Sequence, residues 1–194
     1  PAQFYARKYQ GKSENPSLAA TSSSSIRVVW QDDTPGNYDI YSRNWSNGSW
    51  YFQVENLSGN SGNSKYPVIK QSSYFGGTTF IFWSDNSGNS DTSDYDIYYS
   101  IYGGAPIRYT TLSGPSRYPC IVDRSIQGGG TRFLTSWTEG STPPYTIASK
   151  TFTNPLGKKA IDIVDYHDHP LSNSLSWNYP NPFNPITSIY FTLP

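Results

Sequence analysis

The chain has 194 residues with 14 basic and 14 acidic side chains, so its formal net charge is zero. This balance leaves no electrostatic footprint for nucleic acid or an anionic membrane surface. Charged residues make up 14% of the chain whereas Tyr, Trp and Phe reach 16%, a composition that favours a secreted β-protein in contact with carbohydrate. No apolar run is long enough to span a membrane, and the absence of methionine predicts a processed product or a fragment. The lone cysteine, Cys120, lies in the apolar run PCIV and is predicted to be a buried core thiol.

Three sequence landmarks recur in the same order along the chain. Each unit opens with a proline that precedes a short apolar run, at Pro16, Pro67 and Pro119. A strand-like segment ending in tryptophan and an acid follows, as IRVVWQD to Asp32, FIFWSD to Asp85 and FLTSWTE to Glu139. A third segment comes after a further turn, as YDIYSR (38–43), YDIYYS (95–100) and the weaker YTIASK (145–150). These landmarks predict a repeat with a period of about 52 residues.

Each unit is predicted to hold four short antiparallel strands, bounded by turns of Gly, Asn, Ser and Pro. No segment has a helical period with caps, so the chain is expected to be all-β. Four strands in about 52 residues are typical of a β-propeller blade. A β-sandwich is the alternative, but it would not require the landmarks to recur in one order. The predicted blades cover 14–64, 65–115 and 116–166, within a propeller region of 1–166.

The first residues of the chain, 1–13, are predicted to form the outer strand of a preceding blade, because segment 4–16 aligns without gaps on 107–119. Three blades cannot close a ring, since a propeller needs at least about four. Either further blades precede this segment, which the sequence favours, or two chains pair their open blade edges as a homodimer.

The C-terminal stretch 178–194 reads NYPNPFNPITSIYFTLP. Its proline-rich start, its Thr187 and Ile189 and its final Leu-Pro resemble the beginning of the C-terminal sorting domain of type IX secretion system cargo, found in Bacteroidetes and related phyla. The resemblance implies the first strand of a β-sandwich sorting domain, truncated here. It also implies a secreted or cell-surface protein that meets the type IX secretion machinery. Residues 167–177 are predicted to be the linker between the blades and this segment.

Three carboxylates, Asp32, Asp85 and Glu139, hold equivalent positions after the tryptophan of each unit. Carboxylates are the groups that glycoside hydrolases use for acid and base chemistry, so these three are the candidate catalytic residues. A feature that recurs in every blade is more often architectural, however, and the scaffold interpretation is favoured. Asp39 and Asp96, in the third segment of their units, are predicted to accept hydrogen bonds from turn amides or neighbouring hydroxyls.

The loop 85–96, DNSGNSDTSDYD, is rich in carboxylate and amide oxygens, which are the ligands that calcium prefers. The candidate calcium ligands are Asp85, Asn89 and Asp91. An ordinary loop is the default expectation, because the spacing of the helix-loop-helix calcium site is missing. No other cofactor is predicted. His167 and His169 would form at most a two-ligand metal fragment, with surface residues as the alternative.

The aromatic residues divide into two predicted groups. The landmark tryptophans are expected in the blade core: Trp30, Trp83 and Trp137. Aromatic residues in turn-rich contexts are the candidates for contact with a ligand: Trp45, Trp50, Tyr74 and Tyr102. Their large amphipathic rings suit the faces of sugars.

These observations favour a non-catalytic binding or structural module that contacts glycan or cell-surface protein through propeller loops. The alternative is part of a glycoside hydrolase or polysaccharide lyase, with further catalytic residues in upstream blades. Turnover of a polysaccharide by this chain would favour the enzyme, and binding without turnover would favour the module. A third interpretation is an extracellular assembly built through open blade edges.

Overall fold

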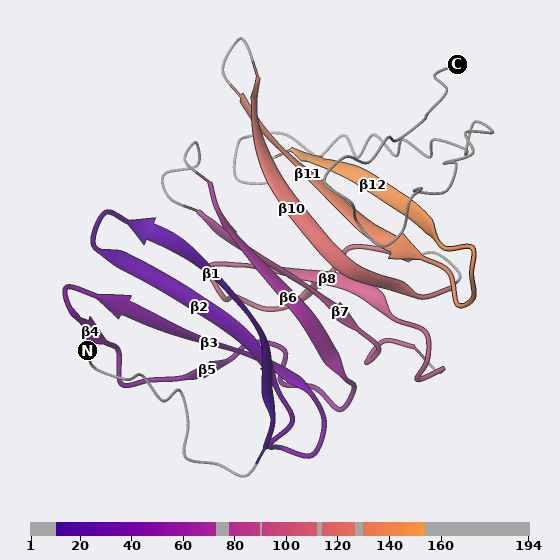
Figure 1. Cartoon of the computed structure of the whole chain (residues 1–194), viewed down its shortest axis with the longest axis horizontal. Coiled ribbons are helices and arrows are strands. Elements are labelled where there is room, and N and C mark those ends of the chain that lie inside the picture. Colours follow the sequence, from indigo (N-terminus) through magenta and orange to yellow (C-terminus); the bar gives the residue numbers. More distant parts are fainter. Residues whose placement is uncertain (1–10, 73–77, 90, 112–113, 127–129, 154–194) are drawn as a thin grey trace, which may run out of the picture.

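The computed structural model describes residues 11–72, 78–89, 91–111, 114–126 and 130–153 (Figure 1). Over these residues the chain is all-β and forms three antiparallel sheets that follow one another in sequence. In this part of the chain, no helix is long and apolar enough to cross a membrane.

The first sheet has the strand order predicted for a blade. Neighbouring strands pair antiparallel in chain order: β1 (Ser13–Ser22), β2 (Ser25–Asp32), β3 (Asp39–Ser46) and β4 (Ser49–Trp50). The short β5 (Glu55–Asn56) also pairs with β3, so β4 and β5 together occupy the place of the fourth strand. Between β3 and β4 the hairpin turn is Asn47-Gly48, and both residues have positive φ, as a tight two-residue hairpin turn requires.

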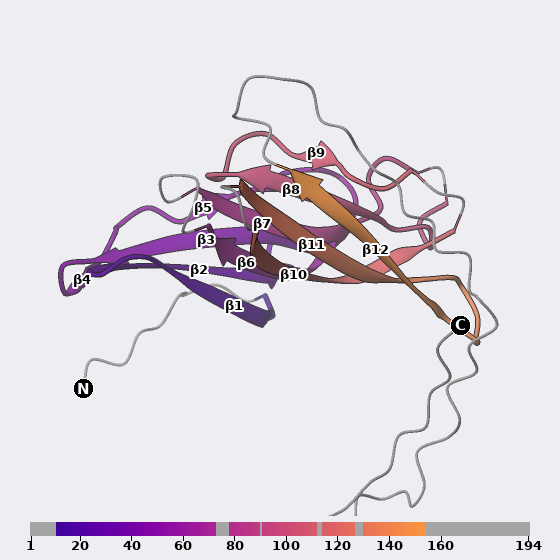
Figure 2. The ribbon, with the colours of Figure 1, turned by 90° about the horizontal axis from the view of Figure 1, so that it is seen from above.

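The second sheet repeats this order, and the described part of the third sheet repeats its first three strands. The second sheet holds β6 (Ser64–Gln71), β7 (Thr79–Asp85), β8 (Asp96–Ile101) and β9 (Ile107–Arg108). The third sheet holds β10 (Ser116–Ile126), β11 (Gly130–Glu139) and β12 (Thr146–Thr153). The first strands β1, β6 and β10 lie along one side of the molecule, and β5, β8 and β9 lie along the other (Figure 2). Because β6 contacts both β1 and β10, these three are the inner strands of the blades.

Each inner strand has a β-bulge at the residue before the landmark proline. The residue there is Asn15, Tyr66 or Tyr118, with φ of 51°, 58° and 58°. Proline has no amide to donate to the ladder, so the strand is interrupted where it occurs. In the second and third sheets, the backbone amide of the bulge residue instead donates a hydrogen bond to a side chain of the preceding sheet. Tyr66 N donates to Gln31 Oε1 over 2.9 Å, and Tyr118 N donates to Ser84 Oγ over 3.2 Å.

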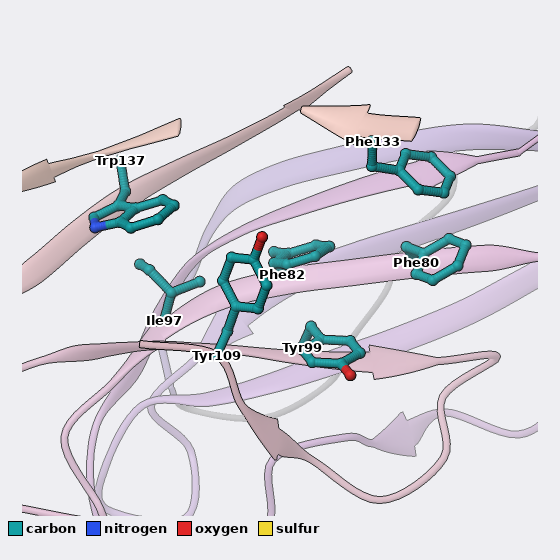
Figure 3. Close-up of a cluster of buried hydrophobic side chains, with 7 residues drawn as sticks. All are labelled: Phe80, Phe82, Ile97, Tyr99, Tyr109, Phe133 and Trp137. Atoms are coloured by element: carbon teal, nitrogen blue, oxygen red, sulfur yellow. The ribbon is translucent and has the colours of Figure 1, made fainter. Parts of the chain in front are cut away.

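Two apolar layers fill the spaces between the sheets. The layer between the first and second sheets is Val29, Ile40, Leu57, Ile69, Ile81 and Trp83. The layer between the second and third sheets is Phe80, Phe82, Ile97, Tyr99, Tyr109, Phe133 and Trp137 (Figure 3). All three landmark tryptophans are buried, which confirms their predicted place in the blade core.

The structure confirms all-β blades of antiparallel strands. The sandwich alternative is wrong, because the sheets form a series of three in which the middle sheet is covered on both faces. Residues 154–166, the predicted remainder of the third blade, lie outside the described residues, as do the linker 167–177 and the sorting-domain strand 178–194. Most of the predicted outer strand, 1–10, also lies outside them, so the division into domains stays a prediction.

The prediction that Cys120 is a core thiol is wrong, because the side chain is exposed. Consecutive residues of a strand point to opposite faces of the sheet. Ile121 points toward the second sheet and packs against the apolar layer there. Cys120 therefore points to the other face of the third sheet, which no described residue covers. An apolar sequence run identifies a strand, but it does not show which of its two faces is covered.

Candidate functional site

The repeated acids lie at the end of each blade's second strand, and Asp85 has the most complete set of partners. Ser64 Oγ, Trp83 Nε1 and Asn60 Nδ2 donate to its Oδ2 over 2.6, 3.0 and 2.9 Å. The Ser87 amide donates to Oδ1 over 2.8 Å, and the side chain is fully buried. Hydrogen bonds to a carboxylate are about twice as strong as neutral ones. This acid therefore joins the first strand, the second strand and the following turn.

The other two acids repeat part of this arrangement. Ser13 Oγ donates to Asp32 over 2.6 Å, and Ser116 Oγ donates to Glu139 over 2.8 Å. Trp137 Nε1 also donates to Glu139. The serine at the start of the inner strand and the acid at the end of the second strand are thus tied in all three sheets.

Glu139 differs from the other two acids in its exposure. Asp32 and Asp85 are buried, whereas Glu139 is half-buried. Burial raises the pKa of the Glu139 carboxyl above its ordinary value, and the hydrogen bonds from Trp137 and Ser116 lower it in part. A glycosidase carboxylate has to reach the bond that it cleaves. The contacts favour the architectural interpretation, and a catalytic role for the three acids stays a prediction.

A second pair of acids begins the third strand. Asp39 accepts a hydrogen bond from Ser58 Oγ over 2.9 Å, and Asp96 accepts one from Thr110 Oγ1 over 2.9 Å. Each hydroxyl in turn accepts the amide of the residue after the acid, over 2.9 and 2.8 Å. These bonds are the hydroxyl partners that the sequence predicted. They join the third strand to the outermost segment of the blade.

The three candidate calcium ligands are each engaged with protein donors. Asp85 has the four partners given above, and Ser93 donates its amide and its hydroxyl to Asp91 Oδ1, both over 2.8 Å. These bonds lower the pKa of Asp91. Arg108 Nη2 donates to Asn89 Oδ1 over 3.0 Å. Among the described residues, no group of three or more His, Cys, Asp or Glu side chains could hold a metal ion. Calcium binding stays a prediction, and the histidine pair lies outside the described residues.

The bulges place two tyrosines side by side on the inner strands. The rings of Tyr66 and Tyr118, which we name the axial tyrosine pair, have centroids 4.4 Å apart and an interplanar angle of 48°. Tyr66 is half-buried, whereas Tyr118 is 53% exposed. Burial and a hydrogen bond with Tyr118 raise the pKa of Tyr66 to about 12. The pair therefore presents the exposed ring of Tyr118, which packs on the half-buried ring of Tyr66.

A cation precedes each tyrosine of the axial pair and lies over a ring of the preceding sheet. Lys65 Nζ is 4.7 Å from the ring centroid of Tyr38, and the Arg117 guanidinium carbon is 4.9 Å from that of Tyr95. Such cation–π contacts are worth about 0.5–1 kcal/mol at exposed sites. Arg117 Nη2 also donates to the Ser93 carbonyl over 2.6 Å. These contacts hold the backbone on either side of the bulges to the neighbouring sheet.

The three described residues among the aromatic candidates from the sequence, Trp45, Trp50 and Tyr102, lie at the opposite end of the blades. Trp45 and Trp50 face each other across β3 and β4, and both are half-buried. The Arg43 guanidinium carbon is 5.9 Å from the ring centroid of Trp50. Tyr102 is exposed at the same end of the second sheet. Tyr74 lies outside the described residues, and ligand binding by all four stays a prediction.

The axial tyrosine pair was missed as a candidate site. Pro67 and Pro119 are sequence landmarks of their units, and each follows a tyrosine directly, at Tyr66 and Tyr118. The available signal was an aromatic residue repeated immediately before proline in an inner strand. A residue in that position is forced out of the ladder, which frees its side chain from the alternation of the strand.

No protein-family model matches the chain, and no curated protein is similar to it. Among solved structures, a GH62 hydrolase in complex with xylotriose has a TM-score of 0.47 and 8% identity, covering 73% of this chain and 46% of that one. The catalytic domain of a Coprinopsis cinerea GH62 alpha-L-arabinofuranosidase has a TM-score of 0.43 and 12% identity, covering 78% and 49%. The chain thus spans about half the length of these structures, and likenesses this distant carry no argument about activity.

Proposed function

We propose that the chain is a non-catalytic binding module of a secreted or cell-surface bacterial protein, and that it binds glycan through aromatic side chains on its blades. The observation that carries this proposal is the axial tyrosine pair. The open ring of Tyr118 is supported by Tyr66, and both backbones are held by bulge hydrogen bonds to the preceding sheet. A preorganised ring loses little entropy when a sugar face stacks on it.

The contacts of the acids support binding rather than hydrolysis. Asp32 and Asp85 are buried and accept hydrogen bonds from strands and turns of their own blade. A carboxylate used in this way has no access to a glycosidic bond. Glu139 is accessible in part, but glycoside hydrolysis generally requires a pair of carboxyl groups. The proposal therefore assigns the acids to the scaffold and the exposed rings to the ligand.

Calorimetric titration with xylo-, cello- and mannooligosaccharides tests this proposal. We expect binding without release of reducing sugar. The variant Tyr118→Ala should lose about fivefold in affinity or more, since an aromatic contact is worth about 1 kcal/mol. Tyr51→Ala is the matched control, because Tyr51 is 56% exposed but lies at the other end of the first sheet. Release of reducing sugar, or equal affinity of Tyr118→Ala and the unchanged chain, would contradict the proposal.

The proposal includes delivery by the type IX secretion machinery of a Bacteroidetes-type bacterium. It rests on the resemblance of residues 178–194 to the start of a sorting domain. An antibody raised against the chain should detect the native protein in the medium or at the cell surface of its host. Detection there in equal amount after loss of the secretion machinery would contradict this part of the proposal. The proposal also includes a homodimer through the open blade edges, with polysaccharide or cell-surface protein as the other partner.

A further inference from the structure

Arg117 lies beside the axial tyrosine pair and is joined to the second sheet. It directly precedes Tyr118 in the inner strand β10. Its guanidinium carbon is 4.9 Å from the ring centroid of Tyr95, and its Nη2 donates to the Ser93 carbonyl over 2.6 Å. The ring and the carbonyl together fix the direction of a long, flexible side chain. The cation is therefore held in place before any ligand arrives.

The same guanidinium lies near the hydroxyls of the axial tyrosine pair, which joins the neighbouring inner strands β6 and β10 (Figure 1). Burial is the main cause of the raised pKa of Tyr66, a hydrogen bond with Tyr118 adds to it, and the charge of Arg117 opposes it. A charge near the surface acts on another group only over a short distance, because water and salt screen it. The exposed ring of Tyr118 and the cation of Arg117 are therefore within reach of one ligand.

Arg117 has donors that the described residues do not use. It forms no ion pair with a described residue, and its one hydrogen bond to them is the bond to Ser93. Asp94 is near enough for the charge of Arg117 to oppose the rise in its pKa, whose main cause is burial, but the two side chains form no ion pair. Because Nε is buried without a partner, a ligand would reach the guanidinium from its terminal nitrogens. Such a group binds a planar carboxylate in a bidentate manner.

Lys65 holds the equivalent place in the second sheet, but its surroundings are different. Its Nζ is 4.7 Å from the ring centroid of Tyr38, as the guanidinium of Arg117 is above Tyr95. The Tyr38 hydroxyl, however, donates to Glu14 Oε2 over 3.2 Å. A carboxylate is therefore already bound to the ring under Lys65, which weakens the attraction of this cation for another anion.

We propose that the glycan bound by the axial tyrosine pair is acidic, and that Arg117 donates hydrogen bonds to the carboxylate of a uronic acid within it. This inference rests on the proposed glycan binding and names the class of sugar. The sugar ring stacks on Tyr118, and the carboxylate at the edge of that ring meets the guanidinium. A neutral sugar makes the stacking contact alone. Arg117 is then the residue that determines the specificity of the site.

Calorimetric titration with matched neutral and acidic oligosaccharides tests the inference. The pairs are a xylooligosaccharide without and with a glucuronic acid branch, a cellooligosaccharide and an oligoglucuronate, and a mannooligosaccharide and an oligomannuronate. In at least one pair the acidic sugar should bind about tenfold more tightly, and a higher ionic strength should reduce this ratio. Equal or weaker binding of every acidic sugar would overturn the inference but leave the proposed glycan binding in place. Failure of all the sugars to bind would contradict both.

Substitution of Arg117 tests the residue itself. In Arg117→Gln the ratio of acidic to neutral affinity should fall to about one, whereas Lys65→Gln, the matched control at the equivalent position, should keep the ratio of the unchanged chain. The ratio is the readout because a loosened tyrosine pair would weaken the binding of both sugars alike. Arg117→Lys should retain only part of the ratio, since an ammonium lacks the guanidinium fork. A ratio that survives Arg117→Gln, or that falls equally in Lys65→Gln, would overturn the proposal.

Discussion

The two interfaces between sheets share a backbone pattern but differ in chemistry at equivalent positions. Three residues before the landmark tryptophan, the first interface has Arg27 and the second has Phe80. In the outermost segment, the first has Leu57 and the second has Tyr109, each of which donates its amide to a third-strand isoleucine over 2.7 Å. The first interface is therefore mainly aliphatic around one tryptophan, Trp83, and has a buried cation, whereas the second is mainly aromatic.

Each interface also has a polar tie suited to its surroundings. Arg27 donates to Ser42, to Glu55 and, across the interface, to the Tyr102 carbonyl over 3.0 Å. In the second interface the hydroxyls of Tyr109 and Thr135 lie 2.8 Å apart. The comparison shows that blades with the same strand register and bulges can have different side chains packed between them. These side chains can be ionic or aromatic, provided that their buried polar atoms have hydrogen-bond partners.

Removing an aromatic ring from the second interface should have the largest effect. Phe80 is buried with its ring centroid 4.5 Å from that of Phe133, so Phe80→Ala leaves a cavity between two sheets. We expect a loss of about 3–5 kcal/mol in the free energy of unfolding, measured in urea. Phe52→Ala, at an exposed position, should change it by less than about 0.5 kcal/mol. A loss below about 1 kcal/mol for Phe80→Ala would show that this layer is not a packed core.

Replacing the buried cation should sharpen the contrast between the interfaces. Arg27→Met keeps most of the side-chain volume but removes the hydrogen bonds to Ser42, Glu55 and Tyr102. We expect a loss of about 1.5–3 kcal/mol in urea denaturation, the range for hydrogen bonds to charged groups. Arg27→Lys should not restore it, because an ammonium cannot reproduce the guanidinium fork. Unchanged stability of Arg27→Met would mean that apolar filling serves this interface equally well.

Substitution of a repeated acid by its amide should lower the free energy of unfolding more where the acid is more deeply buried. Asp85→Asn leaves several donors poorly matched, and we expect a loss of about 1–3 kcal/mol. Glu139→Gln should cost less, because this side chain is half-buried. The order of the two unfolding free energies, measured at neutral pH, checks this prediction, and a reversed order would contradict it.

Glu139 should also make stability depend on pH in a defined direction. Its raised pKa means that the folded state holds the proton more tightly than the unfolded chain. Its contribution is therefore greatest at low pH and is lost as pH rises through the folded pKa. As pH rises through the folded pKa of Glu139, the free energy of unfolding of the unchanged chain should therefore fall relative to that of Glu139→Gln. A shift of opposite sign would show that the hydrogen bonds outweigh burial.

The smallest expected effect is spectroscopic. Tyr66 should remain protonated until about pH 12, well above an ordinary tyrosine. Its folded pKa lies above the unfolded one, so its contribution to stability is lost as pH rises from about 10 to 12. Absorbance titration of Tyr66→Phe should lack this late step. If the late step persists in Tyr66→Phe, another tyrosine is responsible for it.

The strand order of each blade could be predicted from the sequence. Which side chains become buried or adjacent between the sheets could not. The landmark tryptophans and the hydroxyl partners of Asp39 and Asp96 followed from their repetition. The burial of Arg27 did not, because its partners come from three different segments. The sequence predicted the aromatic residues of the turns as the candidate site, and the axial tyrosine pair could not be predicted for a similar reason. Two residues about one period apart become neighbours only when the sheets stack.

Local chemistry in the sequence determined where strands begin, where they bulge and in which order they pair. Prolines remove ladder donors, glycine and asparagine close the hairpins, and alternation sets the two faces of each strand. Only the tertiary structure decided which of those faces is covered. Cys120 and Val68 occupy the same place in their repeats, yet a third sheet packs over one and no described residue covers the other. Burial depends on what lies next to a sheet, and that neighbour is not encoded within the strand itself.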